Sequence, residues 1–117
     1  MSTATLSFKY DGVLRETIAT ITADGNPLTL NVGFQPRRVK LYDPASVLIW
    51  EWVQGLAAGD TFKFATGATT FDTSSAIVVT SKDTENAAAI AANTIEPGVT
   101  FSGAALVNGH TLIAHFE

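Results

Sequence analysis

Apolar and polar residues alternate over short stretches along most of the chain, which is the pattern of β-strands with one buried face. Residues 6–10 alternate before the Asp-Gly pair at 11–12, and a β-branched stretch follows from Val13, so we expect a hairpin there. Further strands are predicted at 28–32, 34–43, 46–53, 61–66 and 76–80, with Phe62 and Phe64 on one face of their strand.

Turn signals separate these strands at short intervals. Residues 23–27, ADGNP, form a predicted turn, Asp43-Pro44 ends a strand, and residues 66–75 are small and polar enough for a hairpin tip. The Asn108-Gly109 pair between VTFSGAALV and HTLIAHF predicts a type I′ hairpin near the end of the chain. Residues 83–93, DTENAAAIAAN, are compatible with a short helix, a strand or a loop. The whole pattern predicts an antiparallel β-sandwich, jelly-roll-like, as one domain over residues 1–117.

One strand departs from the alternation. In SVLIWEWVQG, residues 46–55, Leu48, Trp50 and Trp52 share one predicted face, but the other face is also apolar except at Glu51. We expect one face to pack in the chain's own core and the other against a sibling chain or another protein surface, where large aromatic residues are favoured. The alternative is that both faces are internal to a two-sheet sandwich.

Composition and charge limit the classes of partner. The chain has 46% hydrophobic and only 15% charged residues, against about 25% charged in an average soluble domain, so its surface is built largely from small polar residues. A net charge of −4 argues against nucleic acid and anionic membranes as partners. The chain has no cysteine, no apolar run long enough for a membrane span and no recognisable signal peptide.

Catalytic and metal-binding signatures are weak, so we expect no catalytic residue, no metal and no cofactor. His110 and His115 are five apart on a predicted strand and point to opposite faces, although either could pair with a distant carboxylate. Asp83 and Glu85 could bind calcium on a loop, but no Asp-x-Asp-x-Asp-Gly pattern supports that. Asp11, Asp24 and Asp43 lie in turn motifs, where backbone amides explain them. A hydrolase of unrecognised type would have to lack every common motif.

One charge cluster stands out in this acidic chain. Arg37, Arg38 and Lys40 are three of the seven basic residues and fall within four positions. They form either a solvated strand face balanced by cross-strand carboxylates or a set of salt bridges to a neighbouring chain. Glu51 could meet Arg37 or Arg38 in the same or another copy. We therefore predict an interface made by Arg37, Arg38, Lys40, Trp50, Glu51 and Trp52.

Two segments, VGFQPRRVKLYDPASVLIWEWVQG and GVTFSGAALVNGHTLIAHFE, together resemble small structural proteins of tailed bacteriophages. The resemblance runs from about Gly33 to Glu117 and lies in strands and turns: a Phe-x-Pro-x-x-Val strand, a tryptophan strand and an Asn-Gly pair near the end. It implies a virion component with an all-β fold and threefold association, such as a capsid decoration (cement) protein or a piece of tail or fibre.

These observations predict a non-enzymatic virion protein, assembled in the host cytoplasm, that stabilises the phage head by binding the major capsid protein as a homotrimer. The alternative is a tail- or fibre-associated receptor- or carbohydrate-binding β module, in which an exposed Trp50 or Trp52 stacks on a sugar ring. Burial of the two tryptophans distinguishes these functions, because sugar binding requires one ring to remain open to solvent.

Overall fold

In the part of the chain that the structure describes, ten strands form two antiparallel sheets. The computed structural model describes residues 2–11, 14–32, 36–57, 59–80 and 98–117, and within these residues it contains no helix. The strands are β1 (Thr3–Asp11), β2 (Leu14–Thr22), β3 (Leu28–Leu30), β4 (Arg38–Asp43), β5 (Leu48–Val53), β6 (Thr61–Ala65), β7 (Ala68–Asp72), β8 (Ile77–Thr80), β9 (Gly98–Phe101) and β10 (Thr111–Phe116).

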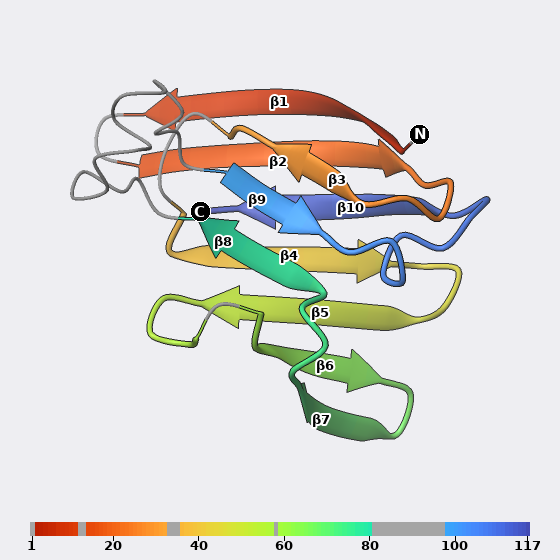
Figure 1. Ribbon diagram of the computed structural model, residues 1–117. Helices are drawn as coiled ribbons and strands as arrows, with labels where there is room; N and C mark the ends of the chain where they lie inside the picture. The colour runs from red at the N-terminus through yellow and green to blue at the C-terminus, as the bar shows by residue number, and fades with distance from the viewer. Residues whose placement is uncertain (1, 12–13, 33–35, 58, 81–97) are drawn as a thin grey trace, which may run out of the picture.

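The two sheets differ greatly in size. Seven strands form the larger sheet in the order β1-β2-β10-β4-β5-β6-β7, and three form the smaller sheet in the order β3-β9-β8. Figure 1 shows the smaller sheet lying obliquely across the middle of the larger one. Four consecutive strands, β4 to β7, pair with their neighbours in the chain, whereas β10 is inserted between β2 and β4. The all-β antiparallel prediction is confirmed, but the jelly-roll connectivity is not.

The core lies between the two sheets. Along β10, Leu112, Ala114 and Phe116 are fully buried while the residues between them are not, as expected for a strand with one covered face. The ring of Phe116 lies 6.0 Å from the ring of Phe101 on β9, so the central strands of both sheets meet there. The Thr17 hydroxyl, buried on β2, donates to the Val32 carbonyl at 3.1 Å and ties the larger sheet to the segment after β3.

The tryptophan strand β5 uses its two faces differently. Trp50 and Trp52 point into the chain's own core and are 5% and 6% exposed, whereas Ile49, Glu51 and Val53 lie on the opposite side. The Lys63 ammonium lies 5.6 Å from the Trp50 ring centroid, in cation–π geometry. The two tryptophans therefore cannot form the centre of an interface with another chain, and that part of the predicted interface is corrected: the surface available on β5 is the face that carries Glu51.

The predicted hairpin at Asn108-Gly109 is wrong. Strand β9 lies in the smaller sheet and β10 in the larger one, so residues 102–110 cross between the sheets. The His110 amide donates to the Val107 carbonyl at 3.0 Å, and Gly109 has a φ of 86°, which fits a type II turn. The amide of Gly109 also donates to the Ala23 carbonyl at 3.1 Å, so this turn packs against the end of β2.

Other predictions from turn chemistry have mixed outcomes. The hairpin of β1 and β2 and the end of β4 at Asp43 are confirmed. Asp24 accepts a hydrogen bond from the Asn26 amide, as expected for a turn aspartate. The expected hairpin tip at 66–75 is shorter than predicted, because Ala68–Asp72 forms β7 and pairs with β6. The segment 83–93 lies outside the described residues.

Replacing Trp52 by alanine tests the assignment of the core. We expect the Trp52→Ala change to lower the free energy of unfolding by about 3–5 kcal/mol, because it removes a large buried aromatic ring. The matched control is Phe71→Ala, since Phe71 is 52% exposed, and it should cost less than about 1 kcal/mol. Urea denaturation followed by circular dichroism measures both. Equal losses for the two variants would contradict the assignment.

A second prediction concerns the crossing segment. A Cβ atom at Gly103 would lie 2.5 Å from the backbone oxygen of Gly25, which no L side chain can tolerate without a backbone shift. We expect Gly103→Ala to cost about 1–3 kcal/mol of stability. At Gly98 the added Cβ would make only ordinary contacts, the nearest at 3.6 Å from the Thr29 side chain. Thermal melting should therefore show little change for Gly98→Ala and a clear fall for Gly103→Ala.

Candidate interaction face

The larger sheet turns one face away from the smaller sheet, and we call it the outer face. Large apolar side chains gather there, and on β2, β4 and β10 the residues next to them in the strand are buried in the core. Five of these side chains are at least 37% exposed, and two more are half-buried. They are Ile18, Ile113, Phe62, Phe64 and Phe71, with Tyr42 and Ile49 half-buried among them.

Strand register places these side chains in adjacent positions. Ile113 lies opposite Tyr42, Tyr42 opposite Ile49, and Ile49 opposite Phe64, which makes one continuous apolar row across β10, β4, β5 and β6. On the neighbouring row, Phe62 lies opposite Phe71, with their rings edge-to-face at 5.6 Å. The three phenylalanines together leave on the order of 250 Å² exposed, given the usual area of an aromatic side chain. A contiguous patch of this kind is typical of a protein–protein contact.

A charged band runs beside the apolar row. Lys40 lies directly opposite Glu51 on β5 and His115 on β10. The Arg38 side chain reaches the Glu51 carboxylate, with Nε 3.8 Å from Oε1. Within one copy, the basic residues of β4 are therefore balanced by a cross-strand carboxylate. Such a partly exposed pair contributes at most about 1 kcal/mol to folding.

His115 lies between two carboxylates on the same face. Its Nε2 is 3.3 Å from Glu16 Oε1, and its Nδ1 is 3.4 Å from Glu117 Oε1. The two carboxylates approach opposite sides of the ring, so the three groups do not converge on one point as metal ligands must. Among the described residues, no group of three such side chains is placed to hold a metal ion. Asp83 and Glu85, which were considered for calcium binding, lie outside the described residues.

The predicted interface residues thus lie in three different places. Arg38, Lys40 and Glu51 come together on the outer face. Arg37 lies just before β4, exposed, and its amide donates to the Glu117 carbonyl at 2.7 Å. Trp50 and Trp52 lie on the other side of the sheet. The sequence did not predict the apolar row, because the row forms only when four strands pair side by side. Alternation in the sequence showed only that Phe62 and Phe64 share a face.

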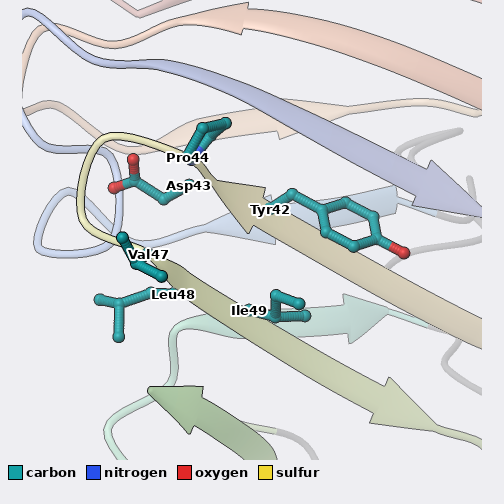
Figure 2. A pocket seen from close by; sticks show the side chains of 6 residues that line it. All are labelled: Tyr42, Asp43, Pro44, Val47, Leu48 and Ile49. Atoms are coloured by element: carbon teal, nitrogen blue, oxygen red, sulfur yellow. The ribbon is translucent and has the colours of Figure 1, made fainter. Parts of the chain in front are cut away.

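A shallow cavity of about 250 Å³ opens at the turn between β4 and β5. Figure 2 shows the residues that line it, and Tyr42 and Ile49 belong to the apolar row of the outer face. Val47 at its rim is exposed and has a φ of 54°, which is strained for a β-branched residue. The other lining residues are Asp43, Pro44 and Leu48. The small hollow therefore lies beside the middle of the apolar row, at the β4–β5 turn.

The turn beside this cavity holds a buried carboxylate that contacts a histidine. Asp43 is almost fully buried, and its Oδ2 lies 2.9 Å from Nδ1 of His110, which fits an Nδ1–H donating to the carboxylate. The Ser46 amide donates to Asp43 Oδ1 at 3.3 Å, and the Ser46 hydroxyl lies 3.5 Å from the same His110 nitrogen. In nucleophilic catalysis the acid and the serine contact different ring nitrogens. This trio is arranged to hold the β4–β5 turn against the segment before β10.

At the far edge of the sheet, Asp72 ends β7. Hydrogen bonds from Ser74 lower the pKa of its carboxyl group, the hydroxyl having the larger effect and the Ser74 amide, at 2.6 Å, the next. Desolvation opposes this shift in pKa weakly, and Lys63 supports it. Asp72 therefore stays charged to lower pH than an ordinary aspartate, next to the most exposed phenylalanine of the outer face.

Comparison with known proteins adds no family and no related structure. No protein-family model, curated protein or solved structure matches the chain. Within the described residues, no helix is long and apolar enough to cross a membrane.

The contact between Asp43 and His110 yields a stability prediction. Replacing His110 by alanine would leave the Asp43 carboxylate buried without its nearest partner, so we expect a loss of about 3 kcal/mol or more in the free energy of unfolding. His115→Ala is the matched control, because His115 and its two glutamates are partly exposed, and it should cost less than about 1 kcal/mol. Chemical denaturation at neutral pH measures both variants. A His110→Ala protein as stable as the control would contradict the structural role of this pair.

Proposed function

We propose that this chain is a non-enzymatic structural protein that works by binding other protein chains through the outer face. One observation carries the proposal: a seven-stranded sheet has one face filled by the core and leaves large apolar side chains exposed on the other. Exposed apolar area of this extent, bordered by polar and charged groups, is what protein interfaces use.

The resemblance to small structural proteins of tailed bacteriophages gives this proposal its specific form. We propose a virion component, and within the virion a capsid decoration protein that contacts the major capsid protein and stabilises the head. Arg37 and Arg38, both exposed where β4 begins, are the residues proposed to contact the capsid. The low content of charged residues supports a protein that is partly covered in its working state. Threefold association stays a prediction from the sequence.

The carbohydrate-binding alternative has no observation in its favour. It required an open tryptophan ring as a stacking platform. Both tryptophans are packed in the core, and the Trp50 ring also faces the Lys63 ammonium. The outer face offers phenylalanines instead, which lack a polar edge for sugar hydroxyls.

Binding to capsid shells tests the proposed function. Shells assembled from the major capsid protein of the same phage should co-sediment with the purified chain. We expect Arg37→Glu and Arg38→Glu to weaken binding by roughly 2–5 kcal/mol if they form desolvated pairs with the shell. Their effect on folding should remain below about 1 kcal/mol, because both side chains are exposed.

The control is Arg15→Glu, an exposed arginine whose position next to Glu16 in β2 places it on the opposite face of the sheet. It should leave shell binding unchanged. Absence of co-sedimentation by the unaltered chain would overturn the capsid function. Equal binding by all three charge variants would remove Arg37 and Arg38 from the contact.

A further inference from the structure

We infer that the outer face binds the same face of a second copy of this chain, in a two-fold symmetric dimer. This inference rests on the proposed function, because it names the partner of the apolar row on that face. A two-fold interface requires a self-complementary surface: if one residue contacts another across it, the reverse contact must also form. The register of the seven-stranded sheet provides such a surface.

The symmetry axis runs parallel to the strands, midway between β4 and β5. A rotation about it brings β4 of one copy over β5 of the other, β10 over β6, and β2 over β7, as the strand order requires. Side chains on one cross-strand row then meet side chains on the same row. Packed sheets keep their strands within about 30° of each other, so this correspondence is closest near the axis.

The charges nearest the axis are complementary under this rotation. Lys40 and Glu51 lie opposite each other on β4 and β5, on either side of the axis. In the dimer, Lys40 of each copy therefore faces Glu51 of the other, and two opposite-charge pairs form with no like charges opposed. An unrelated protein would need its own matching pattern of charges, whereas a second copy has it by symmetry.

The apolar residues also match. On one row, Tyr42 faces Ile49 of the other copy, and Ile113 faces Phe64. On the charged row, the outermost residues are apolar, and Ile18 faces Phe71. Each of these pairs occurs twice in the dimer. The exposed isoleucines, Phe64 and Phe71 are therefore covered by apolar partners, whereas Phe62 on the charged row faces His115 of the other copy.

The size of the face fits a stable dimer. All strands of the larger sheet except β1 overlap across the axis, and these six strands at a spacing of about 4.8 Å are roughly 25 Å wide; five or six residues at about 3.3 Å each extend for nearly 20 Å. The resulting area of about 500 Å² in projection approaches the roughly 800 Å² that each partner contributes to a standard interface, since side-chain relief adds to the flat area.

Measuring mass in solution tests the dimer. The purified full chain, without capsid shells, should sediment as a dimer of twice 12.3 kDa. Replacing Ile113, which is 42% exposed, by serine should weaken dimerisation at least about tenfold, because the polar side chain enters the interface twice. The matched control is Val107→Ser. Val107 is 40% exposed but lies in the crossing segment, so this variant should dimerise as strongly as the unaltered chain.

A charge exchange gives a second, independent measurement. Lys40→Glu alone places like charges across the axis twice and should weaken the dimer, while Lys40→Glu combined with Glu51→Lys should restore it. The inference would be overturned if the chain were a monomer at about 100 µM or formed the trimer predicted from the sequence. It would also be overturned if Ile113→Ser left the dimer unchanged. If the chain binds capsid shells as a monomer, the dimer is refuted and the capsid function is supported. If the chain is a dimer that does not bind shells, only the capsid function is refuted.

Discussion

Successive side chains of a β-strand point to opposite faces of its sheet, and the smaller sheet of this protein covers only one of the two faces of the larger sheet. The described residues place no second layer on the other side. The core consequently takes every second residue of the central strands, including both tryptophans of β5. The remaining residues of the same strands form a surface on which isoleucine and phenylalanine lie beside lysine and glutamate.

This arrangement explains why β5 is apolar on both faces. Its inner residues are large because they fill the space between the sheets, and its outer residues are smaller and interrupted by Glu51. A strand buried on both sides within one chain would have no reason to carry a carboxylate in its middle, since burying a charge requires a partner. Here Glu51 has Arg38 beside it and remains partly in contact with solvent.

Local patterns in the sequence predicted most strands and several turns, because alternation and turn residues act over a few positions. They also grouped Trp50 with Trp52 and Phe62 with Phe64, but alternation cannot tell the core side of a strand from its outer side when both are apolar. The Asn108-Gly109 pair shows a second limit. Its backbone preference is local, but the amide of Gly109 bonds to Ala23, more than eighty positions away, and that contact decides which strands the turn connects. For the same reason, the row from Ile113 to Phe64 was not visible until four strands were placed side by side.

The position of β10 has a consequence for how the chain acquires its structure. Residues 111–116 separate β2 from β4 in the finished sheet, yet they are synthesised after the other nine described strands. Until they emerge, the β1–β2 hairpin and the β4–β7 meander have no strand to join them, and each exposes an unpaired edge with its amide and carbonyl groups. Closing the sheet also requires contacts between distant parts of the chain, which slows folding. The nascent protein is therefore most exposed to misassociation before β10 is inserted.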